Sequence, residues 1–162
     1  MTTKKTQKNT ASFTVNEIRD KIAKYCAYQD RCHWEVEQKL TEFQLIPEAY
    51  DSIFIYLIEN KFLNEERFVN SFVSGKFKIK KWGKIKIQIE LKKRKIPMNL
   101  IEKGLKTIDE TEYQSTLEEL HNKKKTSLKS ERESWKKKMK IRNYLLQKGY
   151  EADLIYEMLN KA

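Results

Sequence analysis

The chain of 162 residues is long enough for one ordinary domain or a short array of smaller units, and it carries a formal net charge of +11. The whole excess lies in residues 64–162, and a field of that sign favours nucleic acid, an acidic protein or anionic lipid as a partner. The sequence has no apolar run near the roughly 20 residues that cross a bilayer, no apolar signal segment and only two cysteines, so we expect a cytoplasmic protein without membrane contact or disulfides.

Four glycines and two prolines are too few for a turn-rich β domain, and this composition predicts an all-α protein. A first helix should run to about Tyr28, since Thr14 can cap its start and Glu17 completes a capping box. A second helix is expected over residues 33–43. Pro47 fits the first turn of a third helix.

The middle of the chain gives conflicting signals. Residues 77–80 and 85–89 alternate between apolar and polar side chains, which is typical of strands. Trp82 and Gly83 between them could form a hairpin turn. The internal repeat described below favours a helix over residues 83–95 instead.

The later helices have recognisable boundaries. Ser130 and Glu133 form a capping-box pattern that predicts the start of an eighth helix, and Gly149 is placed to end it. The starts expected for the fourth, sixth, seventh and ninth helices are Asn64, Pro97, Asp109 and Glu151.

Five apolar positions recur three times along the chain, at spacings of 51 and 54 residues. The first and third copies look helical, so the middle copy should be helical too. The repeating unit is then a module of three short helices that buries little surface alone, which predicts stacking into an elongated array. The matched positions are Trp34, Ile85 and Met139; Val36, Ile87 and Ile141; Leu40, Leu91 and Leu145; Tyr50, Ile101 and Ile155; and Phe54, Leu105 and Leu159. The expected organisation is a disordered tail over 1–13 and modules over 14–62, 63–108 and 109–162.

The densest charge lies in residues 76–95, which hold ten lysines or arginines and a single acid. These cations and Arg67 are the predicted contacts for a polyanionic partner. Two alternatives stay open: Arg67 forms a surface ion pair with Glu65, with Glu66 or with the next module, and Trp82 packs between modules rather than stacking on a base. The predicted contact residues are Arg67, Lys76, Lys78, Lys80, Lys81, Lys84, Lys86, Lys92, Lys93, Arg94 and Lys95.

Four segments resemble the motifs of a known family in their order and spacing. Residues 29–36 (QDRCHWEV) with the following Lys39-Leu40 resemble an Arg-Asp-x-Ser-x-x-Glu-Leu…Lys-Leu opening, and residues 62–69 (FLNEERFV) resemble Leu-Leu-Asp-Asp-x-Arg-Phe-Ala. The others are 81–91, which resemble Lys-x-Gly…Arg-Ile…Glu-Leu, and 148–150, which resemble Arg-Gly-Phe. The family is RecX, the regulators of the bacterial recombinase RecA, and the resemblance covers roughly residues 15–160.

The chain departs from the family motifs at four positions. Cys32 stands where the family has a serine helix cap, Asn64 and Glu65 replace two aspartates, and Val69 replaces an alanine. A cysteine should cap a helix less well than serine, by about 1 kcal/mol or less. None of these departures touches the basic strip.

The resemblance implies a small helical modulator that binds RecA and its DNA filament, lies in the filament groove, and inhibits strand exchange, ATP hydrolysis and repressor cleavage. It places the protein in recombination, DNA repair and the SOS response, as a monomer without cofactor or enzymatic activity and with weak direct DNA binding in some members. The residues themselves show no catalytic motif and no glycine-rich phosphate loop. The cysteines and histidines lack the spacing of a zinc site.

Two rival hypotheses remain. The chain could be a stand-alone basic DNA- or RNA-binding protein, with a steep salt dependence and no need for RecA. Alternatively, it could be a purely structural scaffold whose lysines are only solvated surface. Under the RecA hypothesis, reversing the charges of Lys80, Lys84 and Arg94 is expected to weaken filament binding without unfolding the protein.

Overall fold

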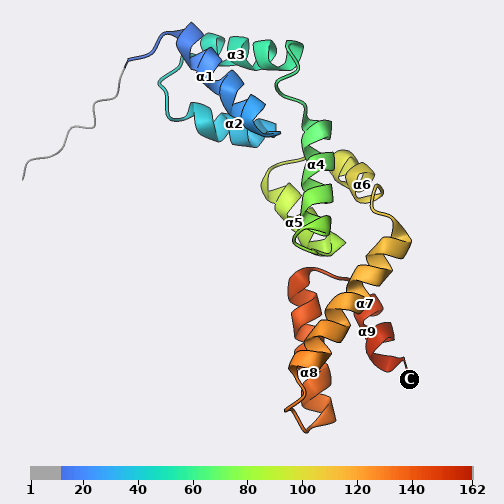
Figure 1. The fold of residues 1–162 in the computed structure, drawn as a ribbon. Coiled ribbons are helices and arrows are strands. Elements are labelled where there is room, and N and C mark those ends of the chain that lie inside the picture. The colour runs from blue at the N-terminus through green and yellow to red at the C-terminus, as the bar shows by residue number, and fades with distance from the viewer. Residues whose placement is uncertain (1–11, 162) are drawn as a thin grey trace, which may run out of the picture.

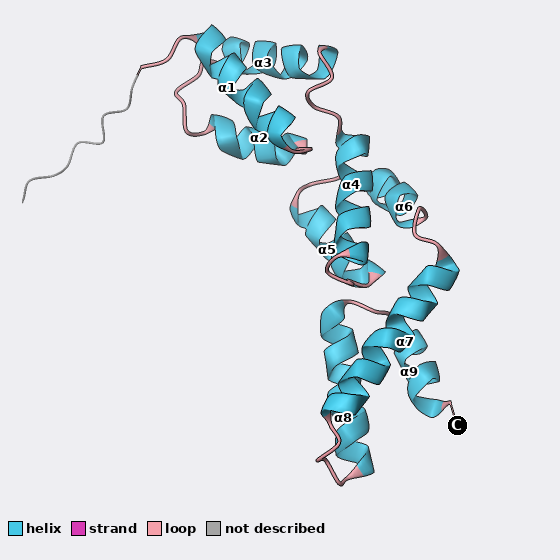
Figure 2. Cartoon of the chain, viewed as in Figure 1, coloured by secondary structure: helices cyan, strands magenta, loops and turns pink. Residues whose placement is uncertain are grey.

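The structure is a computed structural model that describes residues 12–161. These residues form nine α-helices and no strand, in three successive groups of three (Figure 2). The all-α class and the array of three-helix modules are therefore confirmed. The helices are α1 (Val15–Tyr28), α2 (His33–Leu40), α3 (Pro47–Glu59), α4 (Glu65–Lys78), α5 (Lys84–Lys93), α6 (Met98–Leu105), α7 (Glu110–Ser127), α8 (Ser134–Lys148) and α9 (Ala152–Asn160).

The three groups follow one another along a single direction, which gives the elongated shape that the repeat predicts (Figure 1). The chain passes from α1–α3 through α4–α6 to α7–α9, and within the last group α8 runs back towards the second (Figure 1). The residue numbers at which one module gives way to the next stay a prediction. The predicted tail lies outside the described residues, apart from Ser12 and Phe13.

The first module begins and turns largely as the sequence predicts. The Thr14 side chain accepts a hydrogen bond from the Glu17 backbone N–H at 3.2 Å, so the predicted cap is confirmed. Helix α2 ends at Leu40 rather than at Phe43. The Phe43 N–H bonds back only three residues, to the Leu40 carbonyl, because the chain tightens into a turn there.

The middle module resolves the conflict between strand and helix in favour of the helix. Ile87 and Leu91 are fully buried in α5, whereas Ile85 and Ile89 are 45% and 48% exposed. Burial with a spacing of four residues is the helical pattern, and the alternating sequence reflects apolar residues on two faces of one helix. Gly83 caps α5 and does not form a hairpin.

The third module contains one wrong prediction. Helix α8 begins at Ser134 with Glu133 at its cap position and without a side-chain capping bond, so the capping box at Ser130 is wrong. The turn that ends α7 continues through Ser130, since the Glu131 N–H donates to the Leu128 carbonyl at 3.0 Å. Gly149 ends α8 in the left-handed conformation with φ +94°, as predicted.

The central positions of the repeat are the ones most consistently buried. The Val36 and Leu40 columns are buried in all three modules. The Trp34 column is not, because Ile85 and Met139 are about half exposed. The central columns thus form the core of each module, while the first column varies with what each module packs against.

Two apolar clusters hold the array together. The first lies inside α1–α3, and the second runs without interruption through α4–α9, where Tyr113 and Tyr150 are fully buried. Cys32 and Trp34, at the start of α2, reach across to the second cluster. Within residues 12–161, no helix combines the length and the apolar character that a membrane span requires.

Candidate binding surface

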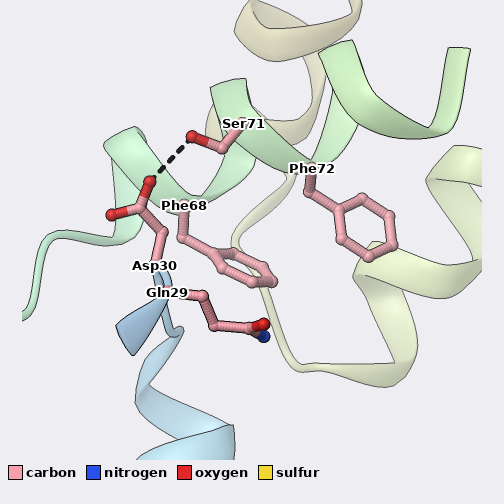
Figure 3. A pocket seen from close by; sticks show the side chains of 5 residues that line it. All are labelled: Gln29, Asp30, Phe68, Ser71 and Phe72. Atoms are coloured by element: carbon pink, nitrogen blue, oxygen red, sulfur yellow. Dashed lines mark hydrogen bonds between the residues drawn. The ribbon is translucent and has the colours of Figure 1, made fainter. Parts of the chain in front are cut away.

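Arg67 connects the first module to the second. Its Nε donates to Asp30 Oδ1 at 2.8 Å, and its terminal nitrogens donate to the backbone carbonyls of Lys61 and Phe62 at 3.1 and 3.3 Å. Ser71 donates to the other oxygen of Asp30 at 2.8 Å (Figure 3). The guanidinium of Arg67 is therefore engaged in an ion pair, although its partner is Asp30 of the preceding module rather than Glu65, Glu66 or the next module, and 42% of its side chain remains exposed.

Arg94 belongs to the same junction. Its guanidinium lies 5.0 Å from the centre of the Phe72 ring, and Nη1 donates to the Glu90 carbonyl at 3.0 Å and to the Glu90 carboxylate at 3.3 Å. Its buried Nε lies 3.7 Å from Glu35 Oε1. Hydrogen bonds from Lys93 and Arg94 hold the pKa of Glu90 below its usual range. Reversing Arg94 would set three acids together, so the structure argues against the expectation that its reversal leaves the fold intact.

Both junctions use equivalent positions of the repeat. His33 and Lys84 are the first residues of the second helix in their modules, and Glu65 and Glu110 are the first residues of the helix that opens the next module. His33 Nδ1 lies 4.0 Å from Glu65, and Lys84 Nζ lies 3.2 Å from Glu110. The hydrogen bond from Lys84 lowers the pKa of the Glu110 carboxyl. Lys84 was predicted as a partner contact, but its ammonium forms an ion pair between the second and third modules.

The second junction is also held by main-chain bonds. The Gly83 N–H donates to the Lys148 carbonyl at 2.7 Å, and the Ile85 N–H donates to the Gly149 carbonyl at 3.0 Å. The end of α8 therefore caps the start of α5. Tyr150 adds a bond from its hydroxyl to the Lys81 carbonyl at 3.0 Å. This direct contact between two backbones fixes the third module on the second.

Replacing Gly83 with alanine is expected to loosen this junction. A β-carbon at Gly83 would overlap the Gly149 carbonyl, which is backbone and cannot rotate away. We expect a loss of about 1–3 kcal/mol in the free energy of unfolding, the usual cost of overpacking. Urea denaturation measures it, with Gly75→Ala as the control because a β-carbon there meets nothing within 4 Å. Equal stability of the two variants would contradict the expectation.

Two further predicted lysines are also engaged in ion pairs. Lys81 Nζ lies 3.4 Å from Glu119 on α7, and Lys93 Nζ lies 3.1 Å from Glu90 within its own helix. Lys93 and Glu119 are well exposed, and Lys81 and Glu90 are partly exposed, so both pairs contribute little stability. They reduce the charge that these two lysines offer to a partner.

Trp82 is partly buried against the second apolar cluster, which favours its packing role over base stacking. The ammonium groups of Lys76 and Lys86 lie 4.9 and 4.5 Å from the centre of its ring. The ring therefore fixes two cations at the surface beside the α4–α5 turn. The remaining predicted contacts form no ion pair within residues 12–161, and they are Lys78, Lys80, Lys92 and Lys95.

Five lysines gather where the second and third modules meet. Lys148 is the central one: burial, and then the like charges of the surrounding lysines, lower the pKa of its ammonium. Its Nζ donates to the Lys80 carbonyl at 3.3 Å, which ties the cation to the α4–α5 turn. We call this group the junction cluster; its members are Lys80, Lys81, Lys86, Lys123 and Lys148. Glu119 pairs with Lys81 and offsets part of this charge, and the remaining excess of positive charge favours an anion as ligand.

The structure thus divides the predicted strip. Arg67 and Arg94 lie at the first junction, whereas Lys80, Lys81 and Lys86 lie at the second. Sequence reasoning missed Lys123 and Lys148 as members of a charged site. Lys148 was visible only as part of a terminal motif, and its 68-residue separation from Lys80 hides their contact in the sequence.

Both cysteines are free thiols. Cys26 and Cys32 are buried, and burial raises the pKa of their thiols to about 11 and about 12. Across residues 12–161, no three histidine, cysteine or acidic side chains are grouped so that they could hold a metal ion.

Comparison with known proteins identifies the family. The family model of the second three-helix domain of RecX matches residues 64–105, and that of the third three-helix domain matches residues 110–159. Together they cover more than half of the chain. The chain belongs to the RecX family.

Curated RecX proteins show the same relationship. The chain is 32% identical over 108 residues to regulatory protein RecX of Clostridium botulinum strain Eklund 17B, and 30% identical over 129 residues to that of strain Alaska E43. These matches cover 66% and 79% of this chain but only 50% and 60% of those two proteins. The chain therefore spans between half and three fifths of the length of these relatives.

A solved RecX structure has the same fold. The crystal structure of RecX from Lactobacillus salivarius superposes with a TM-score of 0.79 at 24% sequence identity, covering 90% of this chain and 94% of that one. The departures from the RecX motifs have local consequences. Cys32 makes no capping bond to α2, and its thiol lies 3.6 Å from the Glu35 carboxylate. Asn64 does cap α4, accepting from the Arg67 N–H at 2.9 Å.

Proposed function

We propose that this chain regulates the bacterial recombinase RecA by binding RecA and the RecA–DNA filament, and that it lowers ATP hydrolysis, strand exchange and coprotease activity without catalysing a reaction itself. It acts in the cytoplasm as a monomer. Membership of a family of regulatory proteins supports this role. An extended, jointed array suits contact along a polymer better than contact with a small molecule.

The observation that carries the proposal is the junction cluster. A helical filament that contains DNA presents regularly spaced phosphates, and a fixed group of cations can neutralise several of them at once. The Gly83–Lys148 and Tyr150–Lys81 bonds hold together the two modules that carry these lysines. The modules themselves therefore need not be ordered when the cluster binds, which favours affinity.

A titration of RecA-dependent ATPase on single-stranded DNA tests the proposal. We expect inhibition that reaches its limit at or below one molecule of this protein per RecA protomer. A basic protein without a role in recombination, such as lysozyme, controls for inhibition that arises only because a cationic protein covers the DNA. Full ATPase activity at stoichiometric ratios would contradict a regulatory role.

The second candidate function is a stand-alone nucleic-acid-binding protein. The junction cluster favours it as well, because phosphates can bind there in the absence of RecA. Titration of bare DNA and of RecA filament at two salt concentrations separates the two candidates. Equal affinity for both at each salt concentration would favour the stand-alone role, since the number of neutralised phosphates sets the salt slope in that case.

A further inference from the structure

Gly75 is a glycine that the fold does not require. It lies inside α4, where glycine destabilises a helix relative to alanine. A β-carbon there would meet no atom within 4 Å, whereas one at Gly83, Gly104 or Gly149 would press into a neighbouring segment. The backbone at Gly75 is therefore open to contact from outside the chain.

The surface around Gly75 is hollow and partly apolar. Phe72, Gly75 and Ile79 follow one another along one side of α4, and Ile79 is 78% exposed. The hollow has a volume of about 200 Å³; we call it the α4 hollow, and its lining residues are Ser71, Phe72, Gly75, Lys76, Ile79 and Lys80. Through Ser71 and Phe72 it adjoins the larger hollow of Figure 3, of about 390 Å³, at the first junction.

The charges at its edge indicate the kind of occupant. Lys76 and Lys80 border the hollow, and its lining contains no acidic side chain. Its floor is poorly suited to a nucleic-acid base, because Lys76 and Arg94 already lie 5.3 and 5.0 Å from the centre of the Phe72 ring and Ile79 is aliphatic. An apolar floor with a cationic border matches a protein segment that combines apolar and acidic side chains.

We propose that the α4 hollow is a docking site for an acidic, amphipathic segment of a protein partner. The backbone of that segment lies over Gly75, where the missing side chain permits close approach. An apolar side chain of the partner packs against Phe72 and Ile79, and its carboxylates lie beside Lys76 and Lys80. This inference rests on the proposed function, because RecA is the partner in which the segment is sought. It assigns protein recognition to the α4 hollow and phosphate recognition to the junction cluster, with Lys80 at the border of both.

Filling the hollow tests the assignment. Gly75→Gln places a side chain in the docking volume without a clash, so its midpoint of thermal unfolding should equal or exceed that of the unmodified protein. We expect its affinity for the RecA–DNA filament to fall about tenfold, the usual loss when a central interface position is disrupted. Its affinity for bare single-stranded DNA should not change. Ser74→Gln is the matched control: this exposed residue lies on another side of α4, and its variant should bind both targets normally.

The possible outcomes separate the two proposals. Normal filament binding by Gly75→Gln overturns the docking site and leaves the proposed function standing. An equal loss of bare-DNA affinity also overturns it, since the hollow would then bind nucleic acid. Absence of filament binding by the unmodified protein overturns both.

Crosslinking identifies the chemistry of the occupant. The two native thiols are buried, so a photoreactive maleimide should attach to a cysteine introduced by Ile79→Cys, with Ser74→Cys as the control. In the presence of the RecA–DNA filament we expect crosslinks from position 79 to a RecA segment of net negative charge, identified by mass spectrometry. Crosslinks confined to DNA, or equal yields from both positions, overturn the proposal.

Discussion

Tyr113→Ala is expected to lower the free energy of unfolding by about 3–5 kcal/mol, the usual cost of truncating a buried aromatic side chain. Tyr113 is fully buried between the second and third modules, with ring centres 5.8 Å from Phe77 and 5.1 Å from Tyr150. Its hydroxyl accepts from the Lys84 N–H at 3.0 Å and donates to Glu151 at 2.9 Å. The loss should therefore appear mainly as early unfolding of α7–α9.

Urea denaturation followed by limited proteolysis measures this effect, since a released third module should be cut between α6 and α7. Tyr113→Phe keeps the ring but leaves the Lys84 N–H without its acceptor, and it should cost about 1–3 kcal/mol. Tyr156→Ala is the exposed control, with an expected change within about 0.5 kcal/mol because Tyr156 is 70% exposed. A Tyr113→Ala loss as small as that of Tyr156→Ala would show that Tyr113 does not hold the junction.

The fold was predictable where the chain repeats itself and less so where it does not. Local pattern alone favoured strands on either side of Trp82. Aligning Ile87 and Leu91 with Val36 and Leu40 showed that these positions form the buried stripe of a helix, which the structure confirms. The start of α8 has no such second source of information, because its first turn precedes the matched positions of the repeat. There the capping pattern at Ser130 was the only signal, and it was misleading.

The candidate site was harder to predict than the fold. A run of charged residues is visible in a short stretch of sequence, whereas an ion pair can join residues that lie far apart in it. Arg67, Lys84 and Arg94 were counted as partner contacts, yet each one pairs with a residue of another module. The partners of Arg67 and Lys84 lie 37 and 26 residues away in the sequence. The repeat held one usable signal: glutamate opens the first helix of both later modules, at the positions that meet His33 and Lys84.

Reversing three charges of the junction cluster should have the largest effect on binding. In the variant Lys80→Glu, Lys86→Glu, Lys123→Glu, the cluster changes from attracting the phosphates of DNA to repelling them. We expect affinity for single-stranded DNA and for the RecA–DNA filament to fall by about tenfold or more. The plot of log affinity against log salt concentration should become shallower by about 2, because each neutralised phosphate contributes about 0.7 to the magnitude of its slope. Fluorescence anisotropy at three salt concentrations measures both quantities.

The fold should survive this change, for an electrostatic reason. In the unmodified protein the pKa of Lys148 is lowered by burial and then by the positive charges of its neighbours, which means that its protonated form is disfavoured in the folded state. Carboxylates at positions 80, 86 and 123 would favour that protonated form and raise the pKa. At any pH below the folded-state pKa of Lys148, raising that pKa favours the folded state, so folding should become no less favourable. The thermal midpoint should stay level or rise while binding falls, which separates lost binding from lost structure.

A second triple variant decides whether position or total charge matters. Lys92→Glu, Lys95→Glu, Lys106→Glu changes the net charge equally, and these exposed lysines form no ion pair within residues 12–161. If binding depends on the geometry of the junction cluster, this variant should lose only the small, salt-sensitive part of the affinity that long-range charge supplies. Equal losses for both triples would mean that net charge controls binding. The cations would then act as a diffuse field, and the fixed junction between the second and third modules would have no part in recognition.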